Sequence, residues 1–351
     1  MNGMTINSWS GIGIFKRKFR NNNEITNKHY YNKVSENYHS VKRIKKIDIL
    51  IIDEVSLMSD KFLECLEYVL RKVRRIDLPF GGINVIMVGD FYQLPPVEDD
   101  YCFKSKIFID NIKNNIILTG NYRFEDNIFH NILLKIRENK LLNEDEHKMI
   151  ENRVSKKKIY PSLVSLRDTV NRINNRKLMK NINDLHVFQA KVEGPENIIK
   201  QTNMVKTLII KKDCPVIYTI NSPELNLYNG SVGIVDKILY DSIYVKFKNM
   251  IIEIKKHTIT IENDDNKDVK YEVTQFPLML AYAVTIHKSQ GQTLTQGSIL
   301  LDKSIFAPGQ AYVALSRFKN LDDISILKYD RDIFYIDTKV KNFYNMICEK
   351  C

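Results

Sequence analysis

Residues 47–58 read IDILIIDEVSLM, and this stretch decides how the chain folds. Branched aliphatic side chains dominate between Ile47 and Ile52, which predicts a strand buried on both faces of a sheet. The strand ends in two adjacent carboxylates, Asp53 and Glu54, and such a pair is costly beside a dry core unless a cation lies next to it. Mg²⁺ with a nucleoside triphosphate would balance this charge, with Asp53 in the metal shell and Glu54 orienting a water. Taken alone, the stretch also fits a strand that runs into a solvated turn.

Residues 83–97, INVIMVGDFYQLPPV, repeat this arrangement. A second apolar strand ends in Gly89 and Asp90, and the glycine permits close approach of another backbone. Gln93 is followed by two prolines that fix the chain, so its neutral amide is held where it can sense a phosphate. Two parallel strands joined by a helix bring their carboxyl ends to one edge, where open α/β sheets bind ligands. We therefore expect both strand ends to contribute to one site.

The composition is that of an ordinary globular protein, 44% hydrophobic and 27% charged over 351 residues, which is enough for two or three domains. No apolar run approaches the ~20 residues of a membrane-crossing helix and no secretory signal is visible, so no membrane partner is expected. The net charge of +11 fits binding to a polyanion such as nucleic acid, and equally fits simple solubility. The cysteines, with a lone CxxC at Cys348 and Cys351, predict neither disulfides nor a zinc site, which fits a reducing intracellular compartment.

Periodicity predicts the remaining elements. We expect a polar surface loop over residues 16–46, helices over 60–75 (capped by Asp60), 126–139 and 167–180, and strands over 115–119 and 163–165. Alternating short strands over residues 205–275, with an Asn229-Gly230 turn, predict a small β-barrel inserted into a second α/β domain.

Two later segments carry further polar and basic groups. Residues 284–294 read VTIHKSQGQTL, and donor side chains packed before Gly291 suit contact with an anion. Residues 310–317 read QAYVALSR, and Arg317 follows a short apolar helix. Arg317, and Arg123 nearer the N-terminus, have the chemistry to stabilise charge on a γ-phosphate. Each arginine alone is also typical of a surface ion pair.

Seven stretches occur in a set order: TINSWSGIGI (5–14), IIDEVSLM (51–58), FGGINVIMVGDFYQLPPV (80–97), LTGNYRF (118–124), LNLYNGSVGIV (225–235), AVTIHKSQGQTL (283–294) and QAYVALSR (310–317). In this order they resemble the Pif1 (petite integration frequency) group of superfamily-one DNA helicases, the branch related to RecD. The resemblance runs from residue 5 to about residue 330, which is nearly the whole chain.

The resemblance implies an α/β fold with two RecA-like P-loop NTPase-type domains and a small SH3-like β-barrel insert. The first domain, incomplete, is expected over residues 1–150, the second over 151–204 plus 276–345, and the insert over 205–275. The implied activity is ATP-dependent 5′-to-3′ translocation on single-stranded DNA, acting on forked duplexes in replication, repair or recombination. A monomer is expected.

The resemblance also implies roles for individual residues. Asp53 and Glu54 would serve Mg²⁺ and the attacking water, Gln93 would contact the γ-phosphate, and Arg123 and Arg317 would stabilise its charge. Gly89, Asp90, Gln290 and Gly291 would contribute to ATP binding, and Thr5, Ser8, Gly11, His287 and Ser289 would lie near the DNA backbone.

One motif of the family is absent, because no Gly-Lys-Ser or Gly-Lys-Thr occurs in the 351 residues. The P-loop lysine and the backbone N–H groups that cradle the phosphates are therefore missing, with the first strand and helix of the first domain. Three interpretations follow: a helicase shortened at its N-terminus, a fragment completed by another polypeptide that supplies the P-loop, or a DNA-binding remnant that does not hydrolyse ATP. The intact polar residues favour the first, and we expect an uncovered apolar flank on the first sheet.

Overall fold

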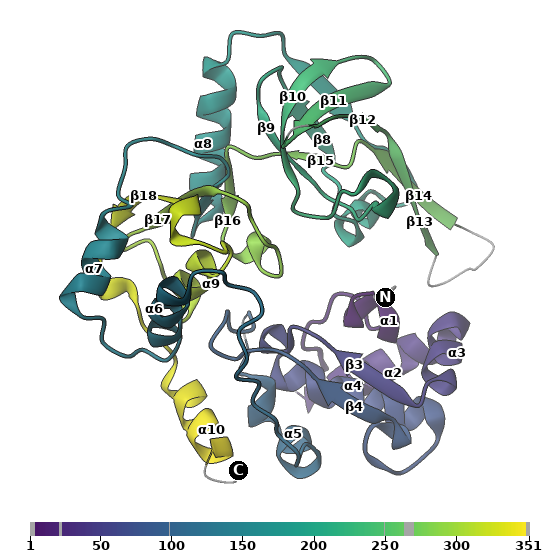
Figure 1. Cartoon of the computed structure of the whole chain (residues 1–351). Coiled ribbons are helices and arrows are strands. Elements are labelled where there is room, and N and C mark those ends of the chain that lie inside the picture. The colour runs from purple at the N-terminus through teal and green to yellow at the C-terminus, as the bar shows by residue number, and fades with distance from the viewer. Residues whose placement is uncertain (1–3, 21–22, 98, 249, 263–269, 349–351) are drawn as a thin grey trace. The chain divides into compact units, whose positions relative to one another are not determined.

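A computed structural model describes residues 4–20, 23–97, 99–248, 250–262 and 270–348 (Figure 1). The chain divides into two compact units: unit 1 is Met1–Gly120 with Ile336–Cys351, and unit 2 is Asn121–Tyr335. The boundaries expected from the sequence lie elsewhere, at residue 150 and near residue 345, and the division into RecA-like domains and an insert stays a prediction. Among the described residues, no helix has the length and apolar character needed to cross a bilayer.

Unit 1 is built around two parallel strands, β3 (Ile49–Ile52) and β4 (Asn84–Met87), which are joined through the long helix α4 (Asp60–Arg74). Leu63, Leu66 and Leu70 of α4 are fully buried in the core of the unit. The other elements of unit 1 are α1 (Ile6–Ser10), β1 (Phe19–Arg20), β2 (Asn23–Glu24), α2 (Thr26–Glu36), α3 (Tyr38–Lys46), α5 (Lys106–Asn111) and α10 (Thr338–Cys348).

The β3–β4 sheet is covered on one face only, so the prediction of a strand buried on both faces is wrong. Leu50 and Ile52 are buried, whereas Ile49 and Ile51 are 56% and 60% exposed. Ile86 on β4, the register partner of Ile51, is also exposed. The expected uncovered apolar flank is therefore present, because the helices of the described chain pack against the opposite face.

Three local predictions for unit 1 need correction. Residues 16–46 hold helices α2 and α3, because widely spaced apolar side chains such as Val34 and Ile44 are fully buried beneath the polar ones. Helix α4 is capped by Ser59, whose hydroxyl accepts from Phe62 N at 3.1 Å, and not by Asp60. Residues 115–119 form no strand, since no described strand pairs with them, and their aliphatic side chains are exposed.

Helix α10 belongs to unit 1 although it follows unit 2 in the chain. The Phe343 ring stacks on Phe103 at 4.3 Å between centroids, and Tyr344 stacks on Tyr92 at 4.6 Å. These aromatic contacts bury the apolar face of α10 against the segment that follows β4. Cys348 is an exposed free thiol at the end of α10, and Cys351 lies outside the described residues.

Unit 2 contains a four-stranded parallel sheet in the order β16-β5-β17-β18. Its strands are β5 (Ser162–Val164), β16 (Ala283–Thr285), β17 (Gly297–Leu301) and β18 (Ile324–Tyr329), and its helices are α6 (Asn127–Arg137), α7 (Glu144–Glu151), α8 (Arg167–Lys180) and α9 (Gln310–Leu315). In Figure 1 these strands lie between α8 and the other three helices. Leu163, Ile299 and Ile326 of three neighbouring strands are fully buried, as parallel sheets require.

The rest of unit 2 is antiparallel. The sheets have the orders β12-β11-β10-β9-β15, β13-β14-β7 and β6-β8. The strands are β6 (His186–Gln189), β7 (Lys191–Glu193), β8 (Thr207–Ile210), β9 (Pro215–Tyr218), β10 (Val232–Ile238), β11 (Ser242–Phe247), β12 (Met250–Lys255), β13 (His257–Glu262), β14 (Lys270–Gln275) and β15 (Leu278–Leu280). The short strands predicted over residues 205–275 are confirmed, and Asn229-Gly230 lies in the turn between β9 and β10.

Candidate functional site

The end of β3 carries Asp53 and Glu54 in an unusual backbone conformation. Glu54 has φ 53° and ψ 44°, the left-handed region that non-glycine residues rarely adopt. Its N–H donates to Asp53 Oδ1 at 2.8 Å. Strain of this kind costs on the order of 1–3 kcal/mol and concentrates at functional sites. The turn directs two carboxylates from one strand end, with Asp53 exposed and Glu54 half-buried.

Gly89 at the end of β4 is required by close backbone approach. It has φ 156°, and a Cβ atom there would lie 2.8 Å from Val55 N. That same N–H donates to Val88 O at 3.0 Å, which ties the two strand ends together. The structure therefore brings Asp53, Glu54 and Gly89 to one edge of the sheet, as the sequence predicted from parallel strands.

The segment after β4 holds an amide oxygen that lacks a partner. Asp90 Oδ1 accepts from Tyr92 N at 3.1 Å and from the Tyr344 hydroxyl at 3.2 Å, and Gln93 N donates to Asp90 O at 3.0 Å. Gln93 Oε1 is buried, yet it accepts no hydrogen bond from any described residue. Buried acceptors are almost always satisfied, so this oxygen is suited to a donor from outside the protein, such as a water.

The acidic groups of unit 1 fit a metal that arrives with a ligand. Among the described residues, no group of three or more His, Cys, Asp or Glu side chains could enclose a metal ion. Mg²⁺ commonly uses only one or two carboxylates and completes its shell with waters and substrate phosphates. Asp53, exposed beside Glu54, can supply that contact.

The predicted DNA-contacting residues of unit 1 lie on and beside α1. Thr5 caps the helix, and its hydroxyl accepts from Ser8 N at 3.3 Å. Gly11 ends it at φ 78°, where a side chain would collide with Ser40. Arg43 of α3 donates to Trp9 O and Ser8 O, both at 3.2 Å. Thr5 and Ser8 are exposed, and Arg43 holds their helix in place.

Arg317 in unit 2 is almost completely buried, with 2% of its surface exposed. Its guanidinium donates to Val313 O at 2.9 Å, to the Ser316 hydroxyl at 3.2 Å, and to Ser289 O and Gln292 O at 3.4 Å each. The arginine therefore joins the end of α9 to the loop that follows β16.

Arg123 reaches the same loop from another part of unit 2. Its guanidinium donates to Gln292 O at 3.3 Å and to the Thr293 hydroxyl at 3.0 Å. Asn121 orients the segment, since its Oδ1 accepts from Arg123 N and Phe124 N at 3.2 and 3.0 Å. Arg123 and Arg317 are far apart in the sequence, yet both donate a hydrogen bond to the same carbonyl oxygen, that of Gln292.

The loop after β16 carries the remaining predicted residues. His287 is half-buried with its ring stacked on Phe306, and burial together with the charge of Arg167 lowers its pKa below the usual 6.5. Ser289 is fully buried and its hydroxyl donates to Ile286 O at 2.8 Å, so that hydroxyl points into the protein. Gln290 is half-buried, and Gly291 is exposed at φ 74°.

Four residues of these surroundings were not singled out as site residues from the sequence: Arg43, Asn121, Gln292 and Tyr344. Asn121, two residues before Arg123, has the spacing of an Asx turn and could have been recognised. Gln292 acts through its carbonyl, which every residue has. Arg43 and Tyr344 act through tertiary contacts that no local pattern reports.

Comparison with known proteins gives consistent matches. Residues 1–149 match the model of the family described as PIF1-like helicase. The chain is 32% identical to "ATP-dependent DNA helicase Pif1" of Bdellovibrio bacteriovorus, an alignment that covers 98% of this chain and 79% of that protein. It superposes on the crystal structure of Pif1 helicase from Candida albicans with a TM-score of 0.82 at 29% identity, covering 98% and 85% of the two chains. For Bacteroides Pif1 in complex with ADP-AlF3 and ssDNA the TM-score is 0.68 at 27% identity, with 99% and 84% covered. These likenesses confirm the predicted α/β fold with RecA-like domains.

Proposed function

Because the chain belongs to the PIF1-like helicase family, we propose that it forms the motor of an ATP-dependent DNA helicase that moves 5′-to-3′ on single-stranded DNA and opens forked duplexes. The relatives with solved structures support nucleotide and DNA as ligands, since one was bound to ADP-AlF3 and ssDNA. Within this proposal, residues 1–150 and 151–204 plus 276–345 act as the two RecA-like domains, residues 205–275 act as the insert, and a monomer is sufficient.

The observation that carries the proposal is the strand-end arrangement of unit 1. Asp53 and Glu54 leave β3 through a strained turn, and Gln93 keeps a buried amide oxygen to which no described residue donates. Bound Mg²⁺ would offset part of the negative charge of the triphosphate of ATP, which favours attack by a water. Asp53 would contact the shell of the metal, Glu54 would accept a proton from the attacking water at its carboxylate, and Gln93 would orient that water or the γ-phosphate.

Two arginines of unit 2 are proposed to act on the nucleotide as well. Arg123 and Arg317 are assigned to the charge that develops on the γ-phosphate, with Gly89, Asp90, Gln290 and Gly291 as further nucleotide contacts. Both guanidinium groups are bonded to Gln292 O. If either arginine turns toward a phosphate, the loop after β16 loses an anchor, so nucleotide state and loop position are coupled.

The same loop carries groups proposed to contact DNA. His287 and Ser289 in unit 2, and Thr5, Ser8 and Gly11 in unit 1, are assigned to the DNA backbone. Backbone N–H and hydroxyl contacts of this kind position a strand without reading its sequence. Exposed Thr5 and Ser8 can contribute hydroxyl groups, whereas Ser289 would contribute through its backbone.

A segment that carries the P-loop, from the same polypeptide or a second one, would complete the nucleotide site. The exposed aliphatic face of the β3–β4 sheet supports this part of the proposal. Ile49, Ile51, Ile86 and Val88 are all exposed. A parallel sheet normally has both faces covered. A further helix could pack on this face, and a further strand could pair at the edge of the sheet.

The proposal is tested on the protein purified from its native cells through a tag at its C-terminal end, so that any P-loop-bearing segment is retained. Duplexes with only a 5′ tail should be unwound in the presence of ATP, and duplexes with only a 3′ tail should not. Glu54→Gln should reduce unwinding by about 10²-fold or more while leaving DNA binding intact, because only the water-activating step is lost.

The matched control is Glu36→Gln, which removes an exposed carboxylate of unit 1 at the end of α2. This variant should unwind as the parent does. Unwinding from a 3′ tail, or equal activity of the Glu54→Gln variant, would contradict the proposal.

A second candidate function is single-stranded-DNA binding without hydrolysis. It is favoured by one observation, the lack of Gly-Lys-Ser and Gly-Lys-Thr in the 351 residues. In that case DNA binding would be salt-sensitive and no native preparation would show ATP-dependent unwinding.

A further inference from the structure

Unit 2 contains a groove outside the residues assigned to nucleotide and DNA. It has a volume of about 610 Å³ and lies between α8, the sheet and the segment before β5. Its lining residues are Ser155, Lys156, Lys158, Val164, Thr169, Arg172, Ile173, Arg176, Leu300 and Leu327. A smaller cavity of about 200 Å³ continues it toward the end of α8, where Lys177 and Lys180 join Lys158 and Arg176.

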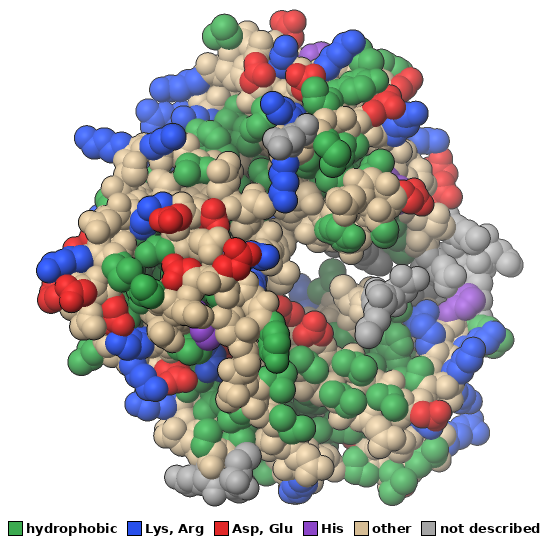
Figure 2. Space-filling view, viewed as in Figure 1, with side chains coloured by type: hydrophobic (Ala, Val, Ile, Leu, Met, Phe, Trp, Pro, Cys, Tyr) green, Lys and Arg blue, Asp and Glu red, His purple; other side chains and the backbone are tan. Residues whose placement is uncertain are grey.

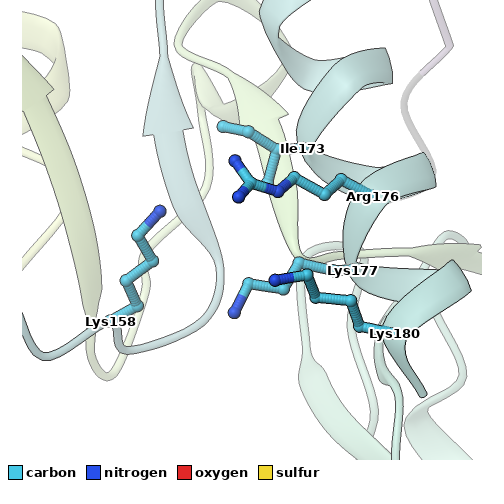
Figure 3. A pocket seen from close by; sticks show the side chains of 5 residues that line it. All are labelled: Lys158, Ile173, Arg176, Lys177 and Lys180. Atoms are coloured by element: carbon cyan, nitrogen blue, oxygen red, sulfur yellow. The ribbon is translucent and has the colours of Figure 1, made fainter. Parts of the chain in front are cut away.

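The walls of the groove and of this smaller cavity together carry six cationic side chains. In Figure 3 the side chains of Arg176, Lys177 and Lys180 on α8 face Lys158 across a gap. The other two cationic side chains are Lys156 and Arg172. Within the described part of the chain, none of these six side chains forms a salt bridge. The nearest carboxylate along the helix, Asp168, precedes Arg172 by one turn without pairing with it. Figure 2 shows Lys and Arg side chains gathered over this part of unit 2, at the upper left.

The floor of the groove is aliphatic. Val164 is buried at the end of β5. Leu300 on the internal strand β17 and Leu327 on the edge strand β18 are only half-buried. Ile173 of α8 is half-buried beside them. Helix α8 contributes little to the core, since Leu178 is its one buried side chain among the described residues. This part of the sheet face is therefore only partly covered, whereas parallel sheets usually have both faces fully covered.

The cationic walls and the apolar floor together indicate which kind of ligand fits the groove. A nucleic-acid strand would satisfy the cations, but it gains affinity from stacking on aromatic rings, and no residue that lines either cavity is aromatic. An acidic peptide with aliphatic side chains on one face satisfies both features, with carboxylates on the rim and aliphatic groups on the floor.

We propose that this groove is a docking site for an acidic amphipathic segment of a partner protein. Aliphatic side chains of the segment cover the half-buried Ile173, Leu300 and Leu327. Its Asp or Glu side chains pair with Lys156, Lys158, Arg172 and Arg176. The site is independent of ATP hydrolysis, so it does not depend on the proposed function.

The test is fluorescence anisotropy of the whole chain with a labelled synthetic peptide that has leucine at helical i, i+3, i+4, i+7 spacing and glutamate elsewhere. Arg172→Glu with Arg176→Glu should weaken binding by about tenfold or more, because both attraction and desolvated pairing are lost. Lys237→Glu with Lys246→Glu is the matched control: both lysines are exposed on β10 and β11 of the same unit, and the change in net charge is identical. This control should bind the peptide as the parent does.

A second variant tests the floor, because charge reversal alone does not. Leu327→Ser should weaken the leucine–glutamate peptide by several-fold while leaving polyglutamate binding unchanged. Circular dichroism melting of each variant establishes that it folds.

Three outcomes would overturn the proposal. The first is equal affinity for polyglutamate and for the leucine–glutamate peptide, and the second is equal loss in the control variant. The third is a loss of affinity for a single-stranded oligonucleotide in the Arg172/Arg176 variant without loss of peptide binding, which would make the groove a nucleic-acid site.

Discussion

The two parallel sheets of this protein differ in how completely they are covered. In unit 2 four strands lie together, and Leu163, Ile299 and Ile326 are fully enclosed. In unit 1 two strands lie together, and every second side chain of β3 is exposed. Both sheets carry polar groups at the carboxyl ends of their strands. The difference shows that a strand's sequence sets its hydrophobicity, whereas neighbouring elements decide whether its second face is buried.

The largest expected effect of the uncovered sheet in unit 1 is on ATP hydrolysis by the isolated 351-residue chain. We expect phosphate release in the presence of single-stranded DNA to be about 10³-fold or more below that of the native preparation, because phosphate-binding N–H groups and the P-loop lysine supply much of the electrostatic stabilisation. Robust DNA-stimulated turnover by the isolated chain, lost on Glu54→Gln, would show that unit 1 needs no complement.

A second prediction concerns the buried arginine of unit 2. Arg317→Ala removes the donor shared by the carbonyls of Ser289, Gln292 and Val313, and lost buried hydrogen bonds cost about 1–3 kcal/mol each. Hydrogen exchange of residues 287–294 should show a fall of about 3 kcal/mol in opening free energy. Arg123→Ala, at the less enclosed arginine, should have a smaller effect, and unchanged protection in both variants would refute the anchoring role.

The two faces of β3 can be compared directly by substitution. Leu50→Ala should lower the stability of unit 1 by about 2–4 kcal/mol because it leaves a cavity in the core. Ile51→Ala, one residue away on the exposed face, should cost less than about 1 kcal/mol in the isolated chain. Urea unfolding followed through the single tryptophan, Trp9, reports on this unit. Equal costs would mean that the outer face of β3 is covered in solution.

Removal of one hydroxyl tests the attachment of α10. Tyr344→Phe keeps the stacked ring on Tyr92 but deletes the bonds to Asp90 Oδ1 and from Phe91 N. The expected loss is about 1 kcal/mol of stability in unit 1, measured by the same urea titration. A larger loss would indicate that the hydroxyl also orients the segment that carries Gln93.

The smallest expected effect is a pH dependence in unit 2. Burial lowers the pKa of His287 below 6.5, so the folded state binds its proton less readily than the unfolded state does. Stability should therefore be fully present above pH 6.5 and fall as the pH is lowered through that value. His287→Asn removes the titrating ring. In this variant the opening free energy of residues 287–294, measured by hydrogen exchange, should depend less on pH near 6.5. An unchanged slope would assign the dependence to another group.

Much of the local structure followed from sequence patterns. The strands at β3 and β4 and the helices α4, α6 and α8 were predicted because runs of aliphatic residues and amphipathic spacing carry strong local signals. Helices α2 and α3 were missed because their few apolar residues are hidden among Lys and Asn. The strand expected at residues 115–119 is absent because a strand needs a neighbouring backbone, and aliphatic content alone does not supply one.

The amino-acid sequence was enough to show which chemical groups are available: a carboxylate pair after one strand, a rigid glutamine after the next, and arginines in two later motifs. Their local order along the chain was sufficient to identify the family. The tertiary structure was needed to show that Glu54 lies in a strained turn and that Arg317 is buried. It was also needed to show that Arg317 and Arg123 donate to the same carbonyl oxygen, and that the Tyr344 hydroxyl of α10 donates to Asp90. These properties depend on contacts between residues far apart in sequence, and burial and hydrogen-bond partners are set by such contacts rather than by local pattern.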